Sequence, residues 1–462
     1  MTIAQRSERH ALPAMPARPA RPLSTLRLLR VAQTNSLAAC DEELFDELVV
    51  ERRFLGRRVY VISDPDGIRH VLQDNCDNYP RLTWIRRIFE FASGSGMLHA
   101  EGAGWRRHRR LINPTLDHRA LLPDVPTLVE LAEALARELA RVPAGQGIDT
   151  NEAFRHLITL SAGHVFAGAD RAIDPMLDRM GQYPGRYGLL ALLPTPGWLR
   201  GLDRARQTRA AAARFAPLLD RLLAERRRAD YAGRKDLLWR LAHAGDRGAG
   251  LSEAELHDEI LTLGATAATS LRPLPWIWYL LATHPGVEAR LQGELEQVLG
   301  GRRPASGDLA KLVYLRQVLD ETMRLYPPLP IMMLRTALAD DTVCGRHIAR
   351  RSIVAIMPWV VHRHRKLWAD PDRFDPDRFA AAAVAERPRY AYLPFAGGPH
   401  VCVGASLAML QLMVATAVLA QRFRFRLVAG RPVEPTAWTN IRPRNGLWMT
   451  VEPRAAAPSR AA

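Results

Sequence analysis

Lysine is almost absent from this chain, although the chain is strongly basic. Its 462 residues include only three lysines, Lys235, Lys311 and Lys366, so arginine supplies nearly all of a formal net charge of +16. A charge of this sign fits a nucleic acid, an anionic membrane or an acidic protein as partner. No zinc-ligand spacing and no aromatic-basic ribonucleoprotein motif accompanies the charge, so the sequence argues against nucleic acid.

Cysteine and long apolar runs are scarce as well. The four cysteines form no Cys-x-x-Cys pair, and a chain of this length does not need a disulfide framework. No apolar run near the N-terminus has the length of a membrane span or of a signal sequence. We therefore expect a soluble, cytoplasmic monomer without a transmembrane anchor.

Helical periodicity dominates the sequence. Leu315, Val318 and Leu319 recur at three- and four-residue steps, which is the spacing of one buried helix face. Strand patterns are short and few, at residues 58–62, 352–357 and 446–451. The sequence predicts a mainly α fold with a small β-sheet.

The chain shows no internal repeat and no linker that would divide it after residue 40. We expect one large domain over residues 26–454. The segments 1–25 and 455–462 are rich in alanine, arginine and proline, a composition that predicts flexible ends.

One cysteine lies in a glycine-bracketed loop near the C-terminus. The run from Phe395 to Gly404 reads Phe-Ala-Gly-Gly-Pro-His-Val-Cys-Val-Gly and precedes an apolar helical segment. A helix N-terminus stabilises a thiolate, and Gly398 and Gly404 let the backbone approach a flat group. The thiolate of Cys402 therefore suits the axial position of a haem iron. A small buried cysteine in a turn is the alternative.

The pattern Phe-x-x-Gly-x-x-x-Cys-x-Gly resembles the haem-binding loop of the cytochrome P-450 family, and the resemblance covers about residues 40–452. It implies a haem-thiolate monooxygenase, with haem b between helices and Cys402 as the iron ligand. Phe395, Gly398 and Gly404 belong to the cofactor loop in this comparison. His400 stands where the family usually has arginine to meet a haem propionate.

Two further segments are similar to the family's propionate-binding elements. The motif Trp-x-x-x-Arg, at Trp105 and Arg109, resembles the helix that crosses one haem edge, and Arg335 falls where another propionate partner is common. Arginine suits a carboxylate through charge-assisted, often bidentate hydrogen bonds. The resemblance thus implies that Arg109, Arg335 and His400 hold the two propionates. For the segment at Trp105, an ordinary basic amphipathic helix is the alternative.

A Glu-x-x-Arg motif at Glu321 and Arg324 precedes the motif Phe-x-Pro-x-Arg-Phe, whose arginine is Arg378. The three-residue spacing puts Glu321 and Arg324 side by side on a helix. The two motifs match the family's structural triad. They imply a buried charge network that holds the fold around the haem loop and takes no part in the chemistry.

The family's oxygen-activating helix is altered in this chain. Thr269 and Ser270 keep the hydroxyl groups, whereas Ala268 replaces the acid that typically helps to relay protons. Proton delivery then depends on Thr269, water or a substrate group. Pro273 and Pro275 predict a kink in this otherwise continuous helix.

Residues 187–199 form the most apolar loop-like stretch and resemble the lid over the family's substrate pocket. They imply an apolar small molecule, such as a terpenoid, a fatty acid or a polyketide, although an ordinary buried loop would look the same. The chain contains no Gly-x-Gly-x-x-Gly dinucleotide motif. Electrons for the reaction with O2 are therefore expected from a separate ferredoxin or flavodoxin, to which a basic surface is suited.

Two alternatives to an O2-dependent monooxygenase remain open at this point. The missing acid at Ala268 suggests a peroxide-driven or redox-neutral haem-thiolate enzyme. A non-catalytic haem protein that binds or senses a ligand is the other.

Overall fold

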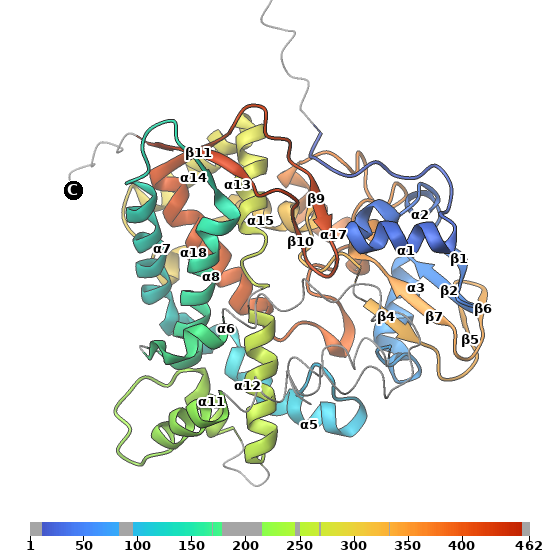
Figure 1. Cartoon of the computed structure of the whole chain (residues 1–462), viewed down its shortest axis with the longest axis horizontal. Helices are drawn as coiled ribbons and strands as arrows, with labels where there is room; N and C mark the ends of the chain where they lie inside the picture. Colours follow the sequence, from blue (N-terminus) through green and yellow to red (C-terminus); the bar gives the residue numbers. More distant parts are fainter. Residues whose placement is uncertain are drawn as a thin grey trace, which may run out of the picture.

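The computed structural model describes residues 12–82, 96–168, 170–177, 215–244, 250–267, 269–331 and 333–454. Helices fill one side of the molecule and a small sheet lies on the other (Figure 1). The prediction of a mainly α fold with a small β-sheet is confirmed. Residues 187–199, the expected substrate lid, lie outside the described residues, as do Ala268 and the tail 455–462.

Long helices form the helical side, and α18 lies at its centre. Leu412, Ala417 and Leu419 of α18 have no exposed surface, so this helix is apolar because protein surrounds it. In the described part of the chain, α18 alone has the length and composition of a membrane span, and most of it is buried inside the protein. The helices of this side are α7 (Val125–Leu139), α8 (Thr150–Ala167), α13 (Leu274–Thr283), α14 (Pro285–Leu299), α15 (Val313–Leu325) and α18 (Ala405–Arg422).

Shorter helices connect and flank these long ones. Helix α3 begins as its sequence predicts, because Asp64 caps its N-terminus by accepting a hydrogen bond from Gly67 N and Pro65 tolerates the first helical position. Among the described residues, these shorter α-helices include α1 (Thr25–Thr34), α2 (Glu43–Asp46), α3 (Pro65–Arg69), α5 (Gly102–Ile112), α6 (His118–Leu121), α11 (Leu237–Ala242), α12 (Glu253–Ala267), α16 (Pro358–Val361) and α17 (Ala381–Glu386).

The main sheet has four strands in the order β1-β2-β7-β4. Strand β2 pairs antiparallel with β1 and parallel with β7, and β4 pairs antiparallel with β7. All four residues of β7 are buried, as expected for a central strand covered on both faces. These strands are β1 (Val49–Phe54), β2 (Arg57–Ile62), β4 (Met333–Thr336) and β7 (Ile353–Ile356).

The other strands form three small sheets at the edges of the helical part and of the main sheet. Strand β11 pairs with both β3 and β8, and two hairpins pair β5 with β6 and β9 with β10. Their bounds are β3 (Gly147–Asp149), β5 (Asp341–Val343), β6 (Arg346–Ile348), β8 (Phe423–Leu427), β9 (Pro435–Ala437), β10 (Ile441–Pro443) and β11 (Trp448–Pro453).

The segment before α1 differs from its expectation. Residues up to 25 were predicted to be flexible, but Ala14 donates its N–H to the Tyr279 hydroxyl at 2.9 Å and accepts from the Tyr326 hydroxyl at 2.8 Å. Arg18 forms an ion pair with Asp372 at 2.6 Å. Composition favoured disorder, but these specific polar contacts tie residues 14–18 to the core.

Candidate functional site

The cysteine loop is a tight turn that ends at α18. The Cys402 N–H donates to Phe395 O at 2.9 Å and closes the loop. Gly398 has φ +67°, and a Cβ there would lie 1.9 Å from Leu72 O. The backbone of residues 70–74, which packs against the loop, therefore requires glycine at position 398. Gly404 is less crowded than Gly398, because a Cβ at Gly404 would meet only the Cys402 sulfur, at 3.9 Å.

Cys402 is exposed as a residue and has no disulfide partner, although protein atoms surround its sulfur. Burial raises the pKa of this thiol, whereas the Gly404 N–H and the Arg109 guanidinium lower it. Both groups stabilise the anionic form. A metal ion would complete the deprotonation, because a thiol ligand binds a metal as the thiolate.

Helix α5 places Trp105 and Arg109 beside this loop. The two residues are one turn apart on the same face, and Trp105 is buried. The His400 ring lies on the Trp105 ring at 4.0 Å between centroids. Burial lowers the pKa of Arg109, and the nearby Cys402 opposes this shift. Trp105, Arg109, His400 and Cys402 are thus brought together, as the sequence predicted.

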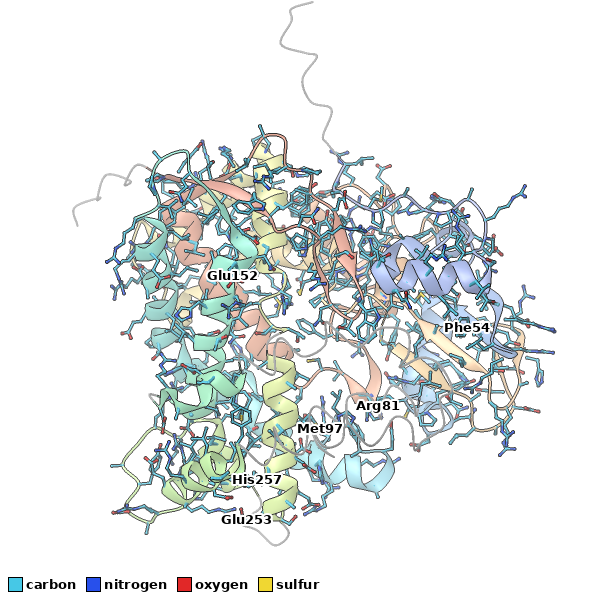
Figure 2. The ribbon with its side chains drawn as sticks, viewed as in Figure 1. Phe54, Arg81, Met97, Glu152, Glu253 and His257 are labelled. Atoms are coloured by element: carbon cyan, nitrogen blue, oxygen red, sulfur yellow. The ribbon has the colours of Figure 1, made fainter. Side chains whose placement is uncertain are left out.

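Arg335 lies on β4, next to two residues that the sequence reasoning missed. Arg81 forms a β-bridge with Arg335, and its Nε donates to Glu101 Oε1 at 2.8 Å. Figure 2 shows Arg81 between α12 and the main sheet. Burial and the charge of Arg81 lower the pKa of Arg335 to about 10. Arg81 belongs to no recognised motif, so only its place opposite Arg335 identifies it.

His400 is a neutral imidazole at neutral pH. Burial and the charges of Arg81, Arg335 and Arg109 lower the pKa of His400 to about 3. Its Nδ1 is buried without a hydrogen-bond partner, and its Nε2 lies 3.8 Å from Glu101. His400 can therefore contribute a hydrogen bond to a propionate. It would contribute a positive charge only if the negative propionate raised the pKa of the imidazole enough to protonate it.

His400 should make the haem-free protein less stable in acid. Because its pKa is about 3 in the fold and 6.5 in the reference state, its contribution is present above pH 6.5 and is lost as the pH falls toward 3. We expect His400→Gln to weaken the acid dependence of the free energy of unfolding by about 2 kcal/mol between pH 7 and 5. Urea denaturation of both proteins at the two pH values measures this, and equal pH dependence would contradict it.

These residues fit an iron protoporphyrin. Arg81, Arg109 and Arg335 bring three positive charges to the site, and Glu101 offsets one of them through its contact with Arg81. The orphaned Nδ1 of His400 supplies a hydrogen-bonding atom without a partner. Two propionates would balance the remaining two charges, and the Cys402 thiol supplies the ligand that iron prefers in such a site.

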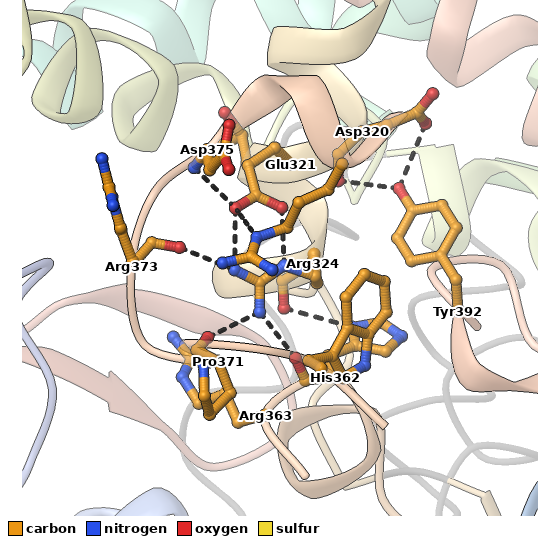
Figure 3. Close-up of polar contacts among 12 residues, drawn as sticks. Asp320, Glu321, Arg324, His362, Arg363, Pro371, Arg373, Asp375 and Tyr392 are labelled. Carbon is orange, nitrogen blue, oxygen red and sulfur yellow. Dashed lines mark hydrogen bonds and ion pairs between the residues drawn. The ribbon is translucent and has the colours of Figure 1, made fainter. Parts of the chain in front are cut away.

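The predicted charge triad is assembled at the C-terminal end of α15 (Figure 3). Arg324 donates two hydrogen bonds to Glu321, at 2.6 and 2.7 Å, and neither side chain is exposed. Arg324 also donates to the backbone oxygens of His362, Pro371 and Arg373 at 2.6–2.9 Å. Arg378 Nε lies 3.5 Å from Glu321 Oε1. The charges of Glu321 and Arg324 compensate each other, and the hydrogen bonds of Arg324 connect segments that are far apart in the sequence.

The segment 362–364 carries no metal site. His362 is buried, accepts a hydrogen bond from Leu393 N at 2.7 Å and lies 3.2 Å from Arg324 O through Nδ1. Within the part of the chain that the structure describes, no three His, Cys, Asp or Glu side chains are grouped to hold a metal ion. His362 thus serves the packing around the triad.

The helix that carries Thr269 is broken, which goes beyond the kink expected from its prolines. Helix α12 ends at Ala267, and α13 begins at Leu274 with Pro273 as N-cap and Pro275 in its first turn. Proline is tolerated there because a first-turn N–H has no intrahelical partner. Two separate helices therefore replace the single kinked one.

Thr269 lies in the turn between the two helices. Its hydroxyl donates to Thr266 O at 2.6 Å, and Ser270 N donates to Ala267 O at 3.1 Å. The hydroxyl group of Thr269 is thus held by the preceding turn, and its oxygen can still accept a hydrogen bond from another donor. Ala268, where the acid is missing, lies outside the described residues.

Comparisons with known proteins agree with this geometry. The sequence profile of the family described as Cytochrome P450 matches residues 24–449. The crystal structure of the cytochrome P450DA haem domain superposes on this chain with a TM-score of 0.78, and the match covers 96% of this chain and 99% of that one at 21% identity. That likeness shows that the two proteins share a fold.

Curated relatives extend over most of both chains. Cyclooctatin synthase of Streptomyces melanosporofaciens is 32% identical over 88% of this chain and 87% of its own length. Cyclooctat-9-en-7-ol 5-monooxygenase of the same organism is 30% identical over 83% of each. The chloroplastic protein LUTEIN DEFICIENT 5 of Arabidopsis thaliana is also 30% identical, over 85% of this chain and 70% of its own. The chain belongs to the cytochrome P450 family and is an oxidoreductase of the monooxygenase class with a haem-iron cofactor.

Proposed function

We propose that this protein inserts one oxygen atom from O2 into an apolar small molecule, with iron protoporphyrin IX (haem b) ligated by Cys402. The proposal is supported chiefly by one observation: the exposed Cys402 lies beside the partly buried guanidinium of Arg109, and no carboxylate of the described residues forms an ion pair with Arg109. When bound, the haem iron supplies the oxygen-activating redox chemistry, and thiolate ligation favours O–O cleavage.

The chain's own residues hold the cofactor and carry protons. Cys402 provides the ligand, and Phe395 O fixes the loop by accepting the Cys402 N–H. Arg109 and Arg335 bind the propionates, with His400 as a neutral hydrogen-bonding partner on Trp105. With alanine at position 268, the Thr269 oxygen, whose hydroxyl donates to Thr266 O, would accept a hydrogen bond from water and so hold a proton donor near the reaction centre.

The substrate is proposed to be a terpenoid, fatty-acid-like or polyketide-like molecule. Cyclooctat-9-en-7-ol, in the name of one relative, is chemically a largely hydrocarbon alcohol. The apolar stretch at residues 187–199 is compatible with such a ligand. We further propose a cytoplasmic, monomeric enzyme.

Electrons are proposed to come from an acidic ferredoxin or flavodoxin, because the net charge of this chain is +16 and opposite charges steer association. The rate of haem reduction by ferredoxin should fall at least about tenfold between low salt and roughly 0.5 M NaCl, where screening is strong. Stopped-flow absorbance measures this rate. A rate that does not change with salt would contradict electrostatic docking.

A peroxide-driven enzyme is the second candidate. The Thr269 hydroxyl donates to Thr266 O and the helix is broken beside it, which weakens the case for an ordered proton relay to O2. In such an enzyme, peroxide would replace both O2 and the electron donor.

The deciding experiment compares two oxygen sources with one ligand. Absorbance titration of the ferric protein against terpenoids, fatty acids and lactones identifies a class that displaces iron-bound water by a low- to high-spin shift. That ligand is then incubated with 18O2 and a ferredoxin system, or with 18O-labelled peroxide alone. Label from 18O2 supports the proposal, whereas label from peroxide alone favours the second candidate. A bound ligand with no product in either arm would contradict both.

A further inference from the structure

Asp341 collects hydrogen bonds from three side chains of one segment, residues 70–79. Its Oδ2 accepts from the Tyr79 hydroxyl at 2.7 Å, from His70 Nε2 at 2.8 Å and from Asn75 Nδ2 at 3.0 Å. Burial would raise the pKa of Asp341, but the hydrogen bonds from Tyr79 and His70 outweigh it, and the pKa lies below its usual range. Asp341 is therefore a carboxylate at neutral pH, which can only accept, and all three contacts are charge-assisted.

A π-helical turn places two of these donors side by side. The turn covers His70–Asp74, directly after α3, and Asn75 N donates to His70 O at 2.8 Å across it. A hydrogen bond between residues five positions apart adds one residue to the turn, which brings His70 next to Asn75. Such turns are rare and are frequent at functional sites. Tyr79 is buried and completes the attachment of segment 70–79 to Asp341.

Segment 70–79 also lies against the cysteine loop. Leu72 O lies only 1.9 Å from the place that a Cβ at Gly398 would occupy, so glycine alone permits this approach of the two backbones. Just before the loop, the Tyr390 hydroxyl donates to Gln73 Oε1. The segment that Asp341 holds is therefore a wall against which the cysteine loop rests.

Apolar packing joins the same parts of the chain. Segment 70–79, the residues that lead into the cysteine loop and the strand of Asp341 share one buried cluster, distinct from the main core, which includes Leu72, Tyr79, Tyr390, Leu393 and Val343. Val343 is at the end of β5, the strand that begins at Asp341. Because protein interiors are close-packed, a displacement of the segment is transmitted to the loop.

The charge triad reaches the loop through different atoms. Leu393 N donates to His362 Nε2 at 2.7 Å, and His362 Nδ1 lies 3.2 Å from Arg324 O. The triad thus supports the entry to the loop at Leu393, whereas segment 70–79 supports Gly398. Asp341 and the triad therefore hold the loop at two separate points.

We propose that Asp341 is a positioning residue for the thiolate ligand: it holds segment 70–79 against the cysteine loop and thereby keeps Cys402 in position to ligate the iron. The inference rests on the proposed ligation by Cys402 and extends it to a residue outside every motif of the site. Asp341 acts through the segment, because its Oδ2 serves the three donors and its Oδ1 accepts from Thr342 N at 2.7 Å.

Hydrogen exchange of the haem-loaded protein, resolved to single amides, tests this positioning without a substrate. The Cys402 N–H is protected by its hydrogen bond to Phe395 O. In Asp341→Ala this amide should exchange about tenfold or more faster than in the wild type, because the segment that keeps the loop closed loses three charge-assisted hydrogen bonds. Amides in the middle of α7 should keep their wild-type rate, since the change is local.

The carbon monoxide complex of the reduced protein gives a second readout. In urea well below the unfolding midpoint, the thiolate-ligated absorbance should be lost about fivefold faster in Asp341→Ala than in the wild type. Far-UV circular dichroism should show unchanged helix content over the same period. Loss of the thiolate without loss of helix separates positioning of the loop from stability of the whole fold.

Asp340→Ala is the matched control. Asp340 is the exposed neighbour of Asp341 and accepts a hydrogen bond from Arg350 N at 2.6 Å, outside segment 70–79. Its replacement should change neither the exchange of the Cys402 amide nor the loss of the thiolate. Tyr79→Phe removes one donor from the other end of the contact and should accelerate exchange at Cys402 by about two- to threefold.

Three results would overturn the inference. An unchanged exchange rate at Cys402 in Asp341→Ala would show that the loop does not depend on Asp341. An equal acceleration in α7 would show a general loss of stability. A Tyr79→Phe protein with wild-type exchange at Cys402 would show that the segment does not transmit the effect. A wild-type protein without a thiolate spectrum would contradict the proposed function instead, because the exchange rate at Cys402 still measures how firmly the loop is held.

Discussion

Replacing Arg324 with methionine is expected to leave little folded protein. The substitution leaves Glu321 as a buried carboxylate with no exposed surface and frees three backbone oxygens that Arg324 now satisfies. Breaking a buried pair by removing one partner costs about 3–5 kcal/mol, and the unsatisfied carbonyls add to this. This is a large part of a typical stability of roughly 5–15 kcal/mol. Urea denaturation and soluble yield measure the effect.

Arg155→Met is the matched control. Arg155 and Glu152 form a pair at 2.7 Å with the same three-residue spacing on α8, but both side chains are largely exposed. Exposed pairs contribute about 1 kcal/mol or less. If Arg324→Met were as stable as Arg155→Met, the triad would not hold this fold together.

Replacing Cys402 with alanine is expected to abolish the thiolate-ligated haem spectrum and O2-dependent turnover. The substitution removes the Cys402 sulfur, while Arg109, Arg335 and His400 remain to hold the propionates. Some haem should therefore still bind, with a different axial ligand. The absorbance of the reduced carbon monoxide complex distinguishes thiolate from other ligation.

Cys344→Ala is the control for the loss of a thiol. Cys344 is also a free and exposed cysteine, but it lies beside Asp64 and Gly67 on another element. Its replacement should not change the haem spectrum. A thiolate spectrum that persists in Cys402→Ala would assign the ligand to a different cysteine.

Short motifs predicted the positions that depend on local geometry. Glu321 and Arg324 are one helical turn apart, so their pairing follows from their spacing. Trp105 and Arg109 share a helix face for the same reason. The cysteine loop was recognisable because glycine spacing and a following helix are local features. Each of these features is determined by residues within about ten positions of one another.

Features that depend on tertiary contacts were not predictable in the same way. Arg81 and Glu101 join the site because β4 pairs with the segment at Arg81, and this pairing is not visible in the sequence. Burial, together with arginines from separate segments, lowers the pKa of His400 and keeps it neutral. The motif does not show the contact that requires Gly398, because Leu72 O, which is distant in sequence, lies where a side chain at this position would be.

The effect of the prolines in the oxygen-activating helix also depends on tertiary contacts. Pro273 and Pro275 predicted a disturbance, and the structure contains a break with a new helix start. Local rules state only that proline is tolerated in the first turn of a helix and unfavourable inside one. Whether the chain kinks or restarts depends on how α13 packs against α14, α15 and β8.

Iron K-edge X-ray absorption of the haem-loaded wild-type protein tests the central claim most directly. The account predicts one sulfur ligand in addition to the four porphyrin nitrogens, because the Cys402 thiol lies beside the propionate-binding residues. The sulfur contribution should disappear in Cys402→Ala and persist in Cys344→Ala. An iron site with only nitrogen and oxygen ligands in the wild-type protein would contradict haem-thiolate chemistry in this chain.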